Sequence, residues 1–104
     1  MGMTRAMIRD MKRCVRAGLR AGATELDLAA ARESSILLLQ RSIAMKHDRL
    51  SLHRLADALK LGAPVDEHAW RHCTPIASEA LRSGTLREIH PTLPALVQKI
   101  TERF

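Results

Sequence analysis

The chain has 104 residues, a net charge of +6, and 46% apolar but only 2% aromatic residues. This length and composition predict one globular domain, residues 1–104, and exclude a disordered chain. No apolar run approaches the roughly 20 residues that a membrane span requires. The two distant cysteines, Cys14 and Cys73, form no disulfide framework and no C-x-x-C pair. We therefore expect a cytoplasmic protein without a membrane segment.

The apolar residues are mainly Leu, Ala, Ile and Met, which favour helix over strand, and no segment alternates apolar and polar residues for long. The sequence therefore predicts an all-α fold. We expect a small helical bundle with one long central helix and several short C-terminal helices.

The first predicted element is a cationic helix within residues 1–20, which Thr4 can cap and which continues to about Leu19. Its apolar residues recur at steps of three and four and share one face, and Gly18 and Gly22 are expected to end it. Residues 1–20 contain six basic residues and one acidic residue, whereas residues 21–104 contain eleven and ten. We expect this helix to steer a charged partner through Arg5, Arg9, Lys12, Arg13 and Arg16. A cationic helix can meet an acidic protein, nucleic acid or an anionic membrane, or can simply face solvent.

The second predicted helix, residues 24–47, is the longest, because it contains no Gly or Pro and begins with Thr24 and Asp27. It could continue without a break to residue 61. If it stops, Asp48 or Ser51 is expected to cap a third helix that ends before Gly62.

Residues 64–104 are interrupted by Pro and Gly and are predicted to form short helices. One is expected over 64–73, and a second is expected to start at Thr74-Pro75 and end at Gly84. Thr85 and Glu88 have capping-box spacing. A last helix would place its apolar residues on one face, namely Leu93, Leu96, Val97, Ile100 and Phe104.

The run Ile36–Leu39 points apolar groups to all sides of a helix. A small domain has little room to cover such a helix, so we expect a second copy or a different protein to cover part of it. The predicted partner-binding residues lie off the stripe that includes Ile36, Leu39 and Ile43: Leu37, Leu38, Ala44 and Met45, with Met7 and Met11 as adaptable apolar surface. The alternative is that both stripes are internal to a compact bundle.

No residue pattern predicts catalysis. His68 and His72 share a helix face and Cys73 follows, but H-E-x-x-H is absent and the ligands diverge. Cys14 is flanked by cations yet lies on the apolar face of its helix. Neither a G-x-S-x-G motif nor a glycine-rich phosphate loop is present. We expect no enzyme, no metal and no cofactor.

A degenerate helix-turn-helix is the main alternative for function. Residues 55–70 place Ala58 in a first helix and Gly62 in a turn, as that motif requires. However, the buried positions of the second helix fall on His68 and Arg71, and that helix begins with Asp66-Glu67, which DNA phosphates repel. A DNA-binding regulator would use residues 55–72 together with the basic N-terminal helix.

The segment from Ser34 to Leu59, SSILLLQRSIAMKHDRLSLHRLADAL, preceded by an arginine-rich helix, resembles small proteobacterial quorum-sensing anti-activators. The resemblance extends to the size and helical character of the whole chain but includes no diagnostic motif. It implies a cytoplasmic helical protein that binds a transcriptional activator of the LuxR type and blocks its dimerisation or DNA binding. It supplies no catalytic residues. We therefore expect a regulatory protein-binding module that is a homodimer.

Overall fold

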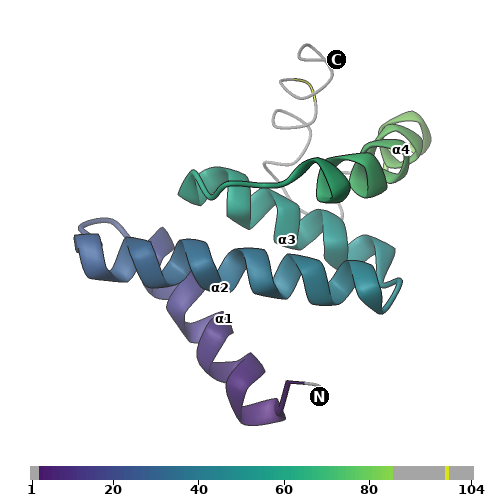
Figure 1. Cartoon of the computed structure of the whole chain (residues 1–104). Coiled ribbons are helices and arrows are strands. Elements are labelled where there is room, and N and C mark those ends of the chain that lie inside the picture. The colour runs from purple at the N-terminus through teal and green to yellow at the C-terminus, as the bar shows by residue number, and fades with distance from the viewer. Residues whose placement is uncertain (1–2, 86–97, 99–104) are drawn as a thin grey trace.

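The computed structural model, which describes residues 3–85 and Gln98, contains four α-helices (Figure 1). They are α1 (Arg5–Leu19), α2 (Glu25–Ala44), α3 (Asp48–Leu61) and α4 (Glu67–Ser83). These described residues contain no strand, so the all-α prediction is confirmed. The helices contain 15, 20, 14 and 17 residues. The prediction of one long central helix among short ones is therefore wrong, because the four helices are similar in length.

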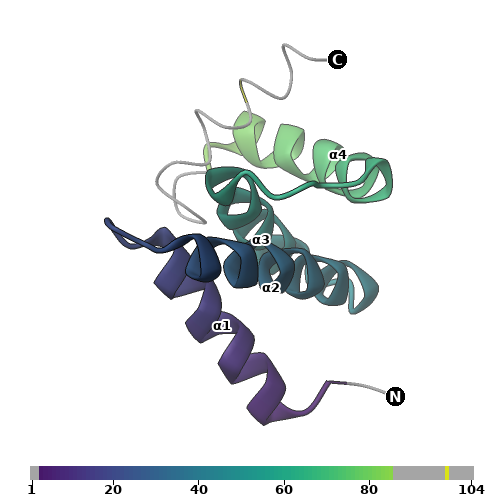
Figure 2. The ribbon, with the colours of Figure 1, turned by 60° about the vertical axis from the view of Figure 1, so that its left-hand side comes forward.

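The helices are stacked in chain order. α2 and α3 form a helical hairpin, α1 packs obliquely across α2, and α4 packs against α3 on the opposite side from α1 (Figures 1 and 2). α2 is therefore covered by α1 on one flank and by α3 on another, and this double cover decides which of its apolar residues are buried.

Local sequence signals set most helix ends. The Thr4 hydroxyl oxygen accepts a hydrogen bond from the Met7 amide (3.1 Å). Thr24 and Asp27 form a reciprocal capping box with N···O distances of 3.1 and 3.2 Å. α3 and α4 end at Gly62 and Gly84, whose φ angles of 70° and 75° lie in the left-handed region that favours glycine. All four of these predicted helix ends are confirmed.

The break between α2 and α3 is a short turn in which Lys46 has a φ of 57°, so residues 24–61 are two helices. Neither Asp48 nor Ser51 caps α3, because its N-cap is His47 without a side-chain cap bond. Ser51 instead faces α2. Its hydroxyl donates to the His47 carbonyl (2.9 Å) and lies 3.1 Å from the Ser42 hydroxyl oxygen.

α4 replaces the two short helices predicted over residues 64–83. It starts after Asp66, whose carboxylate accepts from the Ala69 amide (2.8 Å), and it continues through Pro75. Arg71 and Pro75 are both exposed. The carbonyl of Arg71, which loses its partner because proline has no N–H, can therefore bond to water. The predicted Thr85–Glu88 capping box and the last helix fall on residues 85–104, of which only Thr85 and Gln98 are described.

Two apolar clusters hold the helices together. The main cluster joins α2, α3 and α4 through Leu39, Ile43, Leu52, Leu55, Ala56, Ala69, Cys73, Ala77 and Ala80. The crossing cluster joins α1, α2 and α3 through Val15, Ala31, Leu38 and Leu61.

Gly18 does not end α1, contrary to the prediction from sequence. It is buried inside the helix, where a Cβ atom would collide with the Cβ of Ala31. The missing side chain therefore lets α1 and α2 approach closely at their crossing. Arg32 of α2 stabilises the same region, because its Nε donates to the Leu61 carbonyl at the end of α3 (2.7 Å).

Candidate interaction surfaces

The cations of α1 form the most strongly charged helix face. We call this the cationic face: Arg5, Arg9, Lys12, Arg13 and Arg16, all exposed. It exists because α1 turns its apolar side, including Val15, toward α2, which leaves its long basic side chains in solvent. Four of these cations line a shallow groove of about 290 Å³ together with Ile8.

The cationic face is uncompensated. Among residues 3–85, none of its five cations forms an ion pair. α1 also has no acidic residue in its first turn. By contrast, Arg71 and Arg82 of α4 are paired with Glu67 and Glu79 at N···O distances of 2.6 and 3.0 Å. Among the described helices, α1 therefore carries the largest group of cations without an ion pair.

The two methionines predicted to bind a partner differ in exposure. Met7 is 51% exposed. Met11 is partly buried and packs against the crossing cluster. Met11 therefore contributes to the core in this structure, and the prediction that it is a free contact residue is corrected. Met7 remains exposed on α1, but at 100° per residue it lies on the opposite side of the helix from the cationic face.

The predicted apolar surface of α2 is divided in the same way. Leu38 is only 3% exposed, because it packs between α1 and α3 in the crossing cluster. The prediction that Leu38 is a docking residue is therefore wrong. Leu37 is 38% exposed, Met45 is 47% exposed, and Ala44 is exposed.

Sequence reasoning missed Leu26, whose exposed fraction of 83% is the highest among the large apolar side chains of the described residues. It lies on the same side of α2 as Leu37, because a separation of eleven residues is close to three helical turns. The eleven-residue spacing between Leu26 and Leu37 is the sequence signal that predicts this shared side.

The histidines and cysteines do not converge on a metal-binding site. Within residues 3–85 the structure contains no group of three or more His, Cys, Asp or Glu residues that could hold a metal ion. His68 is exposed. His72 lies at the contact between α3 and α4, with its Nε2 atom 3.7 Å from Asp48 Oδ1 and buried without a hydrogen-bond partner.

Cys73 is fully buried in the main cluster. Burial, with a smaller contribution from the charge of Asp48, raises the pKa of its thiol from 9.0 to about 11. Because the thiolate is the nucleophilic form, Cys73 is a packed thiol with no nucleophilic character at neutral pH.

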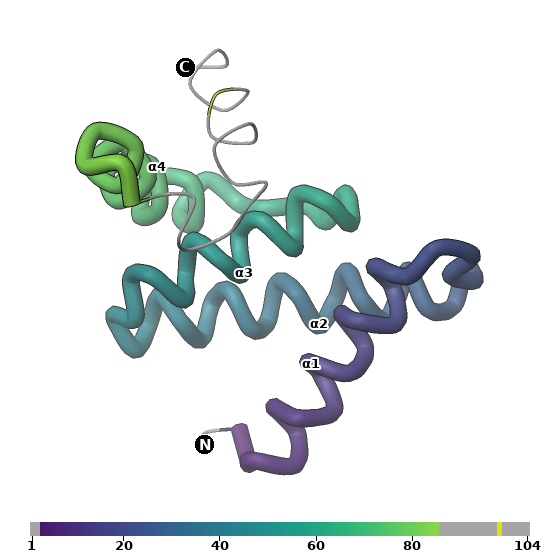
Figure 3. Tube along the Cα trace, turned by 180° about the vertical axis from the view of Figure 1, so that it is seen from behind, coloured from purple at the N-terminus to yellow at the C-terminus, as the bar shows by residue number. Residues whose placement is uncertain are grey.

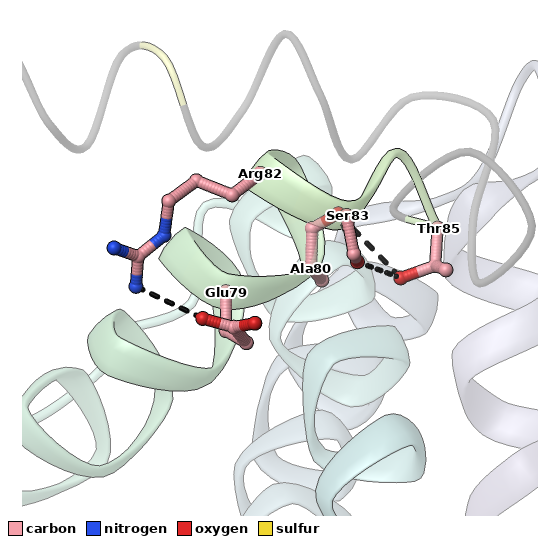
Figure 4. Close-up of polar contacts among 5 residues, drawn as sticks. All are labelled: Glu79, Ala80, Arg82, Ser83 and Thr85. Carbon is pink, nitrogen blue, oxygen red and sulfur yellow. Dashed lines mark hydrogen bonds and ion pairs between the residues drawn. The ribbon is translucent and has the colours of Figure 1, made fainter.

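A cleft of about 430 Å³ lies between the first turn of α3 and the C-terminal half of α4. Glu79, Ser83 and Thr85 are among the residues that line it. Side-chain hydrogen bonds join the residues at the C-terminal end of α4 (Figure 4). The Ser83 and Thr85 hydroxyl oxygens lie 2.9 Å apart, and each hydroxyl lies within hydrogen-bond distance of the Ala80 carbonyl oxygen. The Ser83 and Thr85 hydroxyls are therefore hydrogen-bonded within the helix end, and Glu79 is hydrogen-bonded to Arg82.

The segment tested as a helix-turn-helix comprises α3, residues 62–66 and the start of α4. His68 and Arg71, which occupy the positions that the motif requires to be apolar and buried, are both exposed. Asp66 and Glu67 stand at the N-terminus of α4, and Glu67 is paired with Arg71. This helix start presents negative charge, which disfavours insertion into a DNA groove.

Comparisons with protein-family models, with curated proteins and with solved structures find no significant match to this chain. None of the helices within residues 3–85 combines the length and the apolar content needed to cross a membrane. The site's own geometry therefore has to support any functional proposal.

Proposed function

We propose that this protein is a regulatory binding module that recognises an acidic partner protein through the cationic face of α1. In the finer form of the proposal it acts as an anti-activator that occupies a LuxR-type transcriptional activator and blocks its dimerisation or DNA binding. The observation that carries the proposal is the uncompensated charge on α1. Cations that are paired within the fold gain little from a partner, whereas these five are free to make new contacts.

Apolar contacts would supply the part of the affinity that charge does not. Met7 lies exposed on the same helix, and a methionine adapts its shape to different partner surfaces. Charged contacts at a solvent-exposed rim mainly raise the association rate and select the partner, and they are weakened by salt. The module would thus be steered by the cationic face and held by apolar contacts made elsewhere on its surface, Met7 among them.

Binding to a purified LuxR-type regulator from the native host tests this proposal. We expect the double variant Arg9→Glu/Lys12→Glu to lower the association rate constant by about tenfold or more at low salt, with a smaller change in the dissociation rate constant. Lys60→Glu is the matched control, because Lys60 is an exposed cation on α3. An unchanged association rate in the α1 variant, or no binding by the wild-type protein, would contradict the proposal.

Nucleic acid is the second candidate partner, and it too is supported by the groove that Arg5, Arg9, Lys12 and Arg16 line. Phosphate contacts by these cations would give an affinity that falls steeply with salt. A gel-shift titration of duplex DNA at several salt concentrations separates the two candidates. Tight, strongly salt-dependent DNA binding without activator binding would support the nucleic-acid function instead.

A further inference from the structure

The outer face of α2 is left uncovered by the other described helices. In Figure 1 α2 lies in front of α1 and α3, and in the reverse view of Figure 3 those two helices lie in front of α2. The exposed side of α2 carries residues at alternating steps of four and three: Leu26, Ala30, Glu33, Leu37, Gln40 and Ala44. This spacing keeps all six on one stripe, as in the seam of paired helices. We call it the outer stripe.

The composition of the outer stripe suits close packing against another helix. Leu26 and Leu37 are large exposed apolar residues, and Ala30 and Ala44 are small enough for a second backbone to approach. An exposed stripe that contains leucines at helical spacing is unusual for a face that meets only water.

Two charged residues are placed symmetrically in sequence about Leu37: Glu33 within the outer stripe and the half-buried Arg41 beside it. Glu33 stands four residues before Leu37 and Arg41 four residues after it, while Ala30 and Ala44 stand seven residues before and after. A second α2 running antiparallel, with a twofold axis beside Leu37, would therefore place each Glu33 level with the other copy's Arg41 and each Ala30 level with an Ala44. A parallel arrangement would place like charges at the same level.

From this arrangement we infer that the outer stripe binds the outer stripe of a second copy of this chain, forming an antiparallel α2–α2 homodimer centred near Leu37. The occupant is identified by self-complementarity, because an isologous contact requires one surface to match itself after a twofold rotation. The interface is separate from the cationic face, so the dimer would carry two copies of that face, and the inference does not depend on the proposed partner.

Sedimentation velocity over a wide range of protein concentrations tests the inference. The wild-type protein is expected to sediment as a dimer of twice the 11.6 kDa chain mass. Leu37→Arg is expected to raise the dimer dissociation constant by at least about tenfold, because it brings two like charges together at the twofold axis. Leu19→Arg is the matched control, since Leu19 is similarly exposed but lies on α1. Far-ultraviolet circular dichroism checks that each variant keeps its helices.

Charge reversal tests the antiparallel register. Glu33→Arg alone and Arg41→Glu alone are each expected to weaken the dimer by about threefold or more, and the double variant is expected to restore affinity to near the wild-type value. A wild-type protein that stays monomeric at high concentration overturns the inference. A dimer that is unaffected by Leu37→Arg also overturns it, as does a double reversal that is weaker than both single reversals.

Discussion

The main cluster and the crossing cluster hold the same helix, α2, by different means. On one side Leu39 and Ile43 pack against Leu52, Leu55 and residues of α4, so the contact depends on bulky side chains that fill space. On the other side Gly18 and Ala31 meet where α1 crosses α2, so the contact depends on the absence of side-chain volume.

This difference shows why one helix can be apolar on several sides in a small protein. Leu38 and Leu39 are neighbours in sequence and both are buried, but each belongs to a different cluster. α1 covers one side closely because its glycine allows it to, and the α3–α4 side is filled by leucines. Only the outer stripe is left without a cover from the described helices.

The largest effect is expected from removing bulk in the main cluster. Leu55→Ala should lower the free energy of unfolding by about 3 kcal/mol, because Leu55 is fully buried and its neighbours can only partly collapse into the cavity. Urea denaturation measures this loss. Leu81→Ala is the control on the same scaffold and should cost less than about 1 kcal/mol, since Leu81 of α4 is exposed and lies outside the outer stripe. Equal losses would contradict the described burial.

A smaller effect of unusual sign is expected at the helix crossing. Gly18→Ala should lower the free energy of unfolding by about 2 kcal/mol, although alanine at an unconstrained helix position would raise it by about 1 kcal/mol. The reason is the collision of the new Cβ with Ala31. The double variant Gly18→Ala/Ala31→Gly should recover part of the loss in the same urea titration. A Gly18→Ala protein more stable than wild type would show that the helices do not approach so closely.

The smallest effect on the free energy of unfolding is expected from pH, because the Cys73 thiol is buried in the main cluster. Because its folded pKa of about 11 exceeds the ordinary 9.0, the thiol's contribution is fully present below pH 9. As pH rises from 9 toward 11, the unfolded chain loses the proton while the folded chain keeps it. Stability should therefore fall by about 1 kcal/mol by pH 10 through this group.

Urea titrations at pH 8 and pH 10 measure this decline in the wild type and in Cys73→Ala. The variant should be less stable at both values but should show the shallower decline, since other titrating groups are common to both proteins. At neutral pH a thiol reagent should label the partly exposed Cys14 much faster than Cys73 in the folded protein. Rapid labelling of both would mean that the main cluster is open to water.

The sequence by itself determined the helical class and most helix ends, because these depend on a few neighbouring residues. Thr4 and Thr24 satisfy amides three residues ahead of them, and Gly62 and Gly84 adopt a backbone conformation that other residues avoid. The cationic face was also predictable, since a helix that buries one side must expose the other. The helix break predicted at Thr74-Pro75 is wrong, because a proline is tolerated inside a helix where the carbonyl that it leaves unpaired faces solvent.

Only the tertiary structure decided which apolar residues are covered and where α1 and α2 touch. Periodicity placed Leu37 and Leu38 together on a docking surface, yet the packing of α1 buries Leu38 and leaves Leu37 exposed. The sequence predicts that Gly18 ends its helix, whereas in the structure Gly18 lies inside α1 and directly opposite Ala31 of α2. The physical reason is that a hydrophobic face does not specify its partner, whereas a cap or a left-handed glycine is satisfied by its own segment of chain.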